Sequence, residues 1–79
     1  MAKICVIEDN PDLANMVRTF LLFEHHTVET IGHGGEARDH LKTFEYDLII
    51  LDWELPEVSG IEILKHYREK GGQSPVLML

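Results

Sequence analysis

The sequence predicts an α/β fold in which a parallel sheet carries helices on both faces. Short apolar runs alternate with segments of helical periodicity along the 79 residues, in the order β-α-β-α-β-α-β. The first and third runs are continuous, as buried parallel strands are, and acidic residues close both of them. Right-handed crossovers would join such strands into one doubly wound sheet, so residues 1–79 are expected to belong to a single domain.

The first strand is predicted over residues 3–7 and the first helix directly after it. Cys5, the only cysteine, lies inside the strand, where core packing is expected and no internal disulfide can form. Residues 9–12 combine a capping side chain, a proline suited to a first helical turn and an early acid, which indicates a helix start. Apolar residues at helical spacing then extend the helix to about Phe23: Leu13, Met16, Val17, Phe20 and Leu21.

The second strand is predicted over residues 27–31, and its alternating pattern favours an edge position with one wetter face. Gly32, Gly34 and Gly35 predict a flexible loop after it. A second helix is expected over residues 36–44, with an apolar stripe formed by Ala37, Leu41 and Phe44.

The third strand is predicted over residues 46–51, and a loop containing Pro56 then leads to Ser59 as the N-cap of a third helix. Gly71 and Gly72 end that helix, and residues 75–79 form the last predicted strand, which begins with proline where a lost N–H matters least. A parallel strand with no covering helix after it suggests the N-terminal part of a domain, truncated after its fourth strand.

The net charge and the lengths of the apolar runs argue against some classes of binding partner. Fourteen acidic residues against seven Lys and Arg give a net charge of −7, which disfavours nucleic acid and anionic membranes as direct partners. The N-terminus lacks a signal pattern, and no apolar run approaches the roughly 18 residues needed to span a bilayer. We therefore expect a soluble, cytoplasmic chain.

Three acidic residues mark the candidate site. Glu8 and Asp9 follow the first strand and Asp52 follows the third, so all three are expected at the carboxyl edge of the sheet, where open α/β sheets bind ligands. Neighbouring strands lie about 4.8 Å apart, so Asp9 and Asp52 could share one cation if their strands are adjacent. Three carboxylates that close repel one another unless a cation lies between them.

These residues, in this order, resemble the receiver domain of bacterial two-component response regulators over the whole chain. Residues 4–10 are similar to the acidic first-strand motif, and residues 52–60 are similar to the phosphoacceptor segment, with Pro56 and Gly60 as its proline and glycine. The resemblance implies a flavodoxin-like sheet and a signalling switch rather than an enzyme. Taken alone, Pro56 and Gly60 are turn and helix-start residues.

The resemblance also implies a role for each site residue. Asp52 would take a phosphoryl group from a sensor histidine kinase to form an acyl phosphate, and the switched partner would be an output domain or a downstream protein. Asp9, Asp52 and the main-chain carbonyl of Trp53 would bind Mg²⁺ directly, with Glu8 acting through a water molecule. Glu54, two residues beyond the acceptor, would tune the lifetime of the acyl phosphate.

Three residues of the family pattern fall beyond Leu79: a Ser or Thr after the fourth strand, a Lys after the fifth and an aromatic switch residue. Without the hydroxyl and the Lys, stabilisation of the transferring phosphate falls by a few kcal/mol if each resembles an oxyanion-hole donor, so weak or no phosphorylation of this chain is expected. An unpaired edge at strand 76–79 and uncovered helix faces also favour self-association or domain swapping.

Two rival functions remain open. One is an aspartyl-nucleophile phosphatase or phosphotransferase similar to haloacid-dehalogenase-like enzymes, although the DxDxT-type loop lacks its Thr after Asp52 and Glu54. The other is an interaction fragment that keeps the first part of the fold without phosphotransfer. The five histidines are predicted at the surface rather than in a zinc site, because they lack the helical spacing of such a site: His25, His26, His33, His40 and His66.

Overall fold

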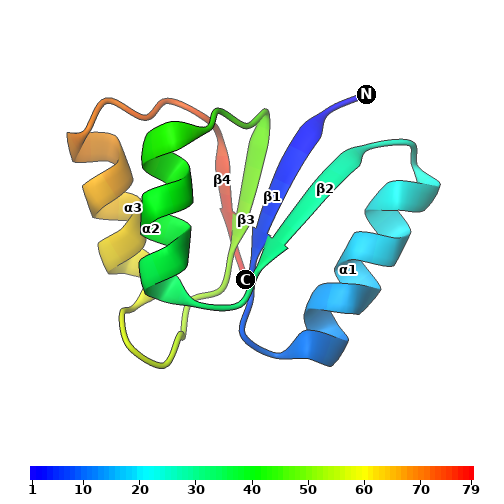
Figure 1. Ribbon diagram of the computed structural model, residues 1–79, viewed down its shortest axis with the longest axis horizontal. Coiled ribbons are helices and arrows are strands. Elements are labelled where there is room, and N and C mark those ends of the chain that lie inside the picture. The colour runs from blue at the N-terminus through cyan, green and yellow to red at the C-terminus, as the bar shows by residue number, and fades with distance from the viewer.

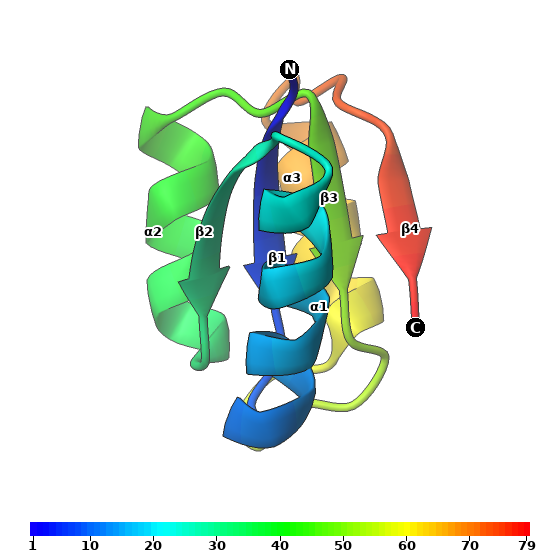
Figure 2. The ribbon, with the colours of Figure 1, turned by 90° about the vertical axis from the view of Figure 1, so that its right-hand side faces the viewer.

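Four parallel strands form one sheet in the order β2-β1-β3-β4 (Figures 1 and 2). A computed structural model describes all residues 1–79, and its strands are β1 (Lys3–Ile7), β2 (Thr27–Ile31), β3 (Leu48–Leu51) and β4 (Val76–Met78). Helix α1 (Pro11–Phe23) covers one face of the sheet, while α2 (Gly34–Thr43) and α3 (Gly60–Glu69) cover the other. The predicted doubly wound parallel sheet is confirmed, as is the edge position of β2.

The core has two parts, one on each face of the sheet. Successive strand residues point to opposite faces, so Cys5 and Ile7 pack toward α2 and α3, while Ile4 and Val6 pack toward α1. Cys5 is fully buried, and this burial raises the pKa of its thiol to about 12, as befits a packing residue. Burial on both faces explains why the central strands are continuous apolar runs.

Side-chain caps start α1 and α3 at the predicted positions. Asn10 Oδ1 accepts hydrogen bonds from the N–H groups of Asp12 at 3.0 Å and Leu13 at 3.2 Å. Ser59 Oγ accepts one from the N–H of Glu62 at 3.2 Å. Each bond satisfies an amide that has no partner within its helix. None of the three helices combines the length and the apolar character that crossing a membrane requires.

The prediction for the start of α2 was wrong. Gly34 and Gly35 form its first turn instead of a loop, and the helix ends at Thr43 rather than Phe44. Gly34 is buried, and a Cβ atom there would overlap Cγ1 of Val58 in the loop before α3. The glycine therefore allows the two segments to pack closely, which is a tertiary requirement and not a sign of flexibility.

The third strand is shorter than predicted, because Tyr46 and Asp47 precede β3 instead of belonging to it. The Ser74 hydroxyl donates a hydrogen bond to the Tyr46 carbonyl, and the Asp47 carboxylate accepts one from the N–H of Lys3 at 2.7 Å. Side-chain bonds thus occupy backbone groups that a longer strand would pair. Similarly, β4 occupies only the middle of the predicted strand 75–79.

Substituting Gly34 by Ala tests this packing. We expect Gly34→Ala to lower the free energy of unfolding by about 1–3 kcal/mol, because the new methyl group overlaps the Val58 side chain. Gly35→Ala is the matched control, since its methyl group would meet only the His33 ring at ordinary contact distance, and Ala stabilises a helix by up to about 1 kcal/mol relative to Gly. Urea unfolding of both variants measures the difference, and equal midpoints would contradict the packing of Gly34.

Candidate functional site

The pairing of β1 with β3 brings the acidic residues to one edge of the sheet. Ile7 and Leu51, the last residues of these strands, are partners in the parallel register, and the N–H of Asp52 donates to the Ile7 carbonyl at 2.9 Å. Carboxylate oxygens of Glu8, Asp9 and Asp52 consequently lie within 4.8 Å of one another. The first and third strands are adjacent, which was the condition for Asp9 and Asp52 to share a cation, and the three acids meet at the expected edge.

The acids differ in exposure and in their surroundings. Glu8 is only 4% exposed, Asp52 is half-buried and Asp9 is exposed. Burial raises the pKa of Glu8, and the nearby charge of Asp52 raises it further, whereas the Asn10 N–H, 3.0 Å from Glu8 Oε2, lowers it. The hydrogen bond from the Asn10 N–H therefore offsets only part of the free-energy cost of burying the charged Glu8 carboxylate.

No Lys, Arg or His side chain forms an ion pair with this cluster. Its two ion pairs are Lys3 with Glu29 and His33 with Glu57, and neither includes Glu8, Asp9 or Asp52. Hard oxygen ligands grouped at this spacing suit a small divalent cation such as Mg²⁺. The donor set fits that ion.

The acids line a hollow of about 790 Å³ together with residues 53–56, Asn10, Leu13 and Leu79. Trp53 in this loop is 54% exposed. The N–H of Glu54 donates to Asp52 Oδ1 at 3.4 Å, a local bond that turns the chain directly after the acid. The hollow gives Asp52 access to a ligand of modest size.

Gly60 controls how closely α3 approaches the end of β3. A Cβ atom at this position would overlap the main-chain oxygen of Asp52, and the Gly60 N–H donates to the Trp53 carbonyl at 2.9 Å. A carbonyl oxygen has two lone pairs, so that of Trp53 retains one for another ligand. The sequence placed Gly60 at a helix start but gave no signal of this close approach, because it depends on tertiary packing.

The histidines lie outside the acidic cluster. His33 Nε2 lies 2.9 Å from Glu57 Oε1 and so links the start of α2 to the loop before α3, a contact that no local spacing signals. His66 is partly buried, and its Nε2 is buried without a hydrogen-bond partner, so the predicted surface position holds only in part. The one group of three or more close metal-binding side chains is the acidic cluster, which contains no histidine.

Two curated relatives resemble the whole of this chain. Response regulator RppA of Synechocystis sp. is 38% identical over 79 residues, which are 98% of this chain and 34% of that protein. The phosphate regulon transcriptional regulatory protein PhoB of Rhizobium meliloti is 41% identical over 81 residues, which cover 100% of this chain and 36% of that protein. The chain thus spans about a third of the length of these relatives.

A solved structure and a family model agree with these relatives. Response regulator TrrA of Thermotoga maritima, solved in complex with Mg²⁺ and BeF, matches with a TM-score of 0.92 and 31% identity, over 99% of this chain and 68% of that one. The model of the response regulator receiver domain family matches residues 4–79. This chain belongs to the response regulator receiver domain family.

Proposed function

We propose that this chain is the phosphoacceptor part of a cytoplasmic two-component system. Asp52 receives a phosphoryl group from a sensor histidine kinase, and its phosphorylation switches an output domain or a downstream protein. The observation that carries this proposal is the position of Asp52 at the end of β3, with its oxygens within 4.8 Å of those of Glu8 and Asp9. Membership of the receiver family supports it.

Each residue of the site has a role in this proposal. Asp9, Asp52 and the Trp53 carbonyl hold Mg²⁺, and the buried Glu8 acts through a water molecule. When bound, Mg²⁺ neutralises charge that accumulates on the transferred phosphoryl group. An oxygen of Asp52 forms the new bond to phosphorus as the bond to the kinase histidine breaks, and an acyl phosphate results.

Glu54 is placed to influence how long that acyl phosphate lasts. It is exposed, it lines the same hollow as Asp52, and its backbone N–H is bound to Asp52 Oδ1. A carboxylate at the rim of the hollow can affect the approach of water to the phosphorylated side chain. This role rests on the proposed phosphorylation of Asp52.

The open edge of β4 favours a second candidate function, that of an interaction fragment. β4 is the last strand in the sheet order and is paired only with β3 (Figure 2). Leu77 in this strand is 53% exposed, and Phe20 of α1 is 63% exposed. An unpaired strand edge favours pairing of one chain with another, and exposed apolar side chains elsewhere on the surface add to that tendency.

Phosphorylation of the 79-residue chain is the direct test of the leading candidate. With Mg²⁺ and a labelled phosphohistidine donor, we expect labelling about 100-fold slower than that of the receiver domain of RppA, because the hydroxyl and Lys contacts lie beyond Leu79. Asp52→Asn should show no label. Labelling at the RppA rate would contradict the expected impairment, label on Asp52→Asn would contradict the assigned acceptor, and turnover of a phosphate ester would support an enzyme instead.

Removing one charge from the cluster should stabilise the metal-free chain. In EDTA, we expect Asp52→Asn to raise the free energy of unfolding by about 1 kcal/mol, because it relieves repulsion with Glu8 and Asp9. Asp12→Asn is the control, since Asp12 is an exposed acid in the first turn of α1, where negative charge is favourable. Urea unfolding measures both, and a loss of stability in Asp52→Asn would show that repulsion does not dominate there.

Self-association through β4 can be measured by sedimentation. We expect species larger than 9.1 kDa to form with rising concentration, and Leu77→Lys to suppress them, because a charge beside the strand edge opposes pairing. Thr30→Lys is the matched control on β2, the strand at the opposite edge. Only 9.1 kDa species at high concentration, or equal effects of both substitutions, would count against pairing through β4.

A further inference from the structure

We propose that a cavity between α2 and α3 binds a small polyanion of about the size of a diphosphate. The cavity measures about 680 Å³, within the range of small-molecule sites, and is lined by the two helices and by the segments 43–46 and 71–74 that follow them. These segments lead into β3 and β4, so the cavity lies near the amino ends of these strands. The acidic cluster follows the carboxyl ends, and the two sites are therefore separate.

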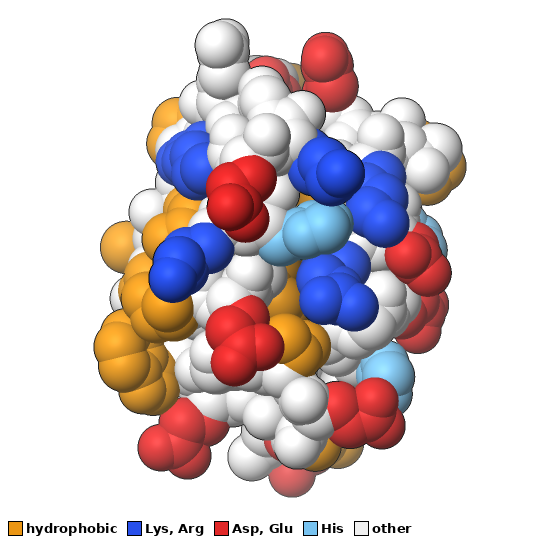
Figure 3. Space-filling view, turned by 90° about the vertical axis from the view of Figure 1, so that its left-hand side faces the viewer, with side chains coloured by type: hydrophobic (Ala, Val, Ile, Leu, Met, Phe, Trp, Pro, Cys, Tyr) orange, Lys and Arg blue, Asp and Glu red, His pale blue; other side chains and the backbone are white.

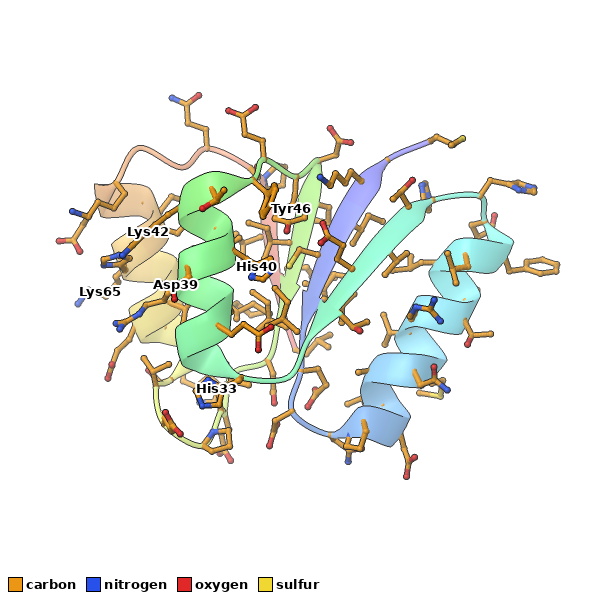
Figure 4. The ribbon with its side chains drawn as sticks, in the orientation of Figure 1. His33, Asp39, His40, Lys42, Tyr46 and Lys65 are labelled. Carbon is orange, nitrogen blue, oxygen red and sulfur yellow. The ribbon has the colours of Figure 1, made fainter.

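Positive charge gathers around this cavity although the chain is acidic overall. Of its seven Lys and Arg residues, five lie on α2, on α3 or at the C-cap of α3: Arg38, Lys42, Lys65, Arg68 and Lys70. Figure 3 shows Lys and Arg side chains around a histidine on this face, and Figure 4 shows Lys42 and Lys65 on the side away from α1. The same two helices also carry the acids Glu36, Asp39, Glu62 and Glu69, so the surface as a whole has mixed charge, and it is the lining of the cavity that is rich in cations.

Three of these cations line the cavity itself and have no carboxylate partner. They are Arg38, Lys42 and Lys70, and neither of the two ion pairs in the molecule includes any of them. The only carboxylate residue in the lining is Glu45. An anion with several charged oxygens would supply the partners that these side chains lack.

Two backbone N–H groups and one histidine ring nitrogen in the lining of the cavity have no hydrogen-bond partner. The loop N–H groups of Glu45 and Gln73 form no hydrogen bond to the rest of the chain. His66 is a lining residue, and its Nε2 is buried without a partner. Oxyanions bind backbone N–H groups as well as Arg and Lys, so these two amides are available to such a ligand.

Neutralisation of the helix dipoles does not explain the cluster by itself. Lys42 in the last turn of α2 and Lys70 at the C-cap of α3 lie where a cation offsets the partial negative charge of a helix end. Arg38 lies in the middle of α2, outside that turn, yet it borders the same cavity. The feature that Arg38, Lys42 and Lys70 share is their position in the lining of the cavity.

Isothermal titration of the 79-residue chain with inorganic pyrophosphate in EDTA tests this site. Saturable binding is expected, and Arg38→Gln/Lys42→Gln should weaken it at least about tenfold through the loss of two charge contacts. The matched control is Arg18→Gln/Lys65→Gln, which removes the same two residue types from positions outside the cavity and should change affinity less than about twofold. Circular dichroism of both double variants verifies that the helices remain.

Each outcome decides for or against the cavity. Absence of binding at millimolar pyrophosphate, or equal weakening by the two double variants, would overturn the proposal. A parallel titration with citrate distinguishes phosphate from carboxylate ligands. A site for phosphates binds pyrophosphate more tightly than citrate, whereas a general polyanion site binds both. Because the titration contains no Mg²⁺ and uses no acidic-site variant, its result does not depend on the proposed role of Asp52.

Discussion

The parallel pairing of β1 with β3 is the constraint on which the site depends. The register aligns Ile7 with Leu51, and the bond from the Asp52 N–H to the Ile7 carbonyl continues that register beyond the strands. A slip of one residue would turn the side chains of β3 to the opposite faces and move Asp52 away from Glu8 and Asp9. Burial of both strands on both faces opposes such a slip, so the hydrophobic core fixes the geometry of a polar site.

The hydrophobic core brings three carboxylates together, and their burial and mutual repulsion are unfavourable. Glu8 is buried beside another carboxylate, and only one backbone N–H, that of Asn10, bonds to it. Burial and the neighbouring carboxylate therefore raise the pKa of Glu8. A divalent cation would offset part of this cost, so an arrangement that is unfavourable in the metal-free chain suits Mg²⁺.

The predictable parts of this molecule are those set by local pattern. Continuous apolar runs placed β1 and β3, capping chemistry placed the starts of α1 and α3, and acids at strand ends placed the site. Contacts between distant segments were not predictable, as Gly34 shows, since its need to be glycine comes from the close approach of Val58. The buried ring nitrogen of His66 and the cavity beside it likewise arise only when α2 and α3 pack together.

The central claim is that Glu8, Asp9 and Asp52 form one cation site, and a Mg²⁺ titration followed by the fluorescence of Trp53 tests it most directly. Trp53 is the only tryptophan and lines the hollow beside the acids. The account predicts a saturable change that weakens in Asp52→Asn and persists in Asp39→Asn, an exposed acid of α2. A folded chain by circular dichroism that shows no saturable response, or one that Asp52→Asn leaves unchanged, would contradict it.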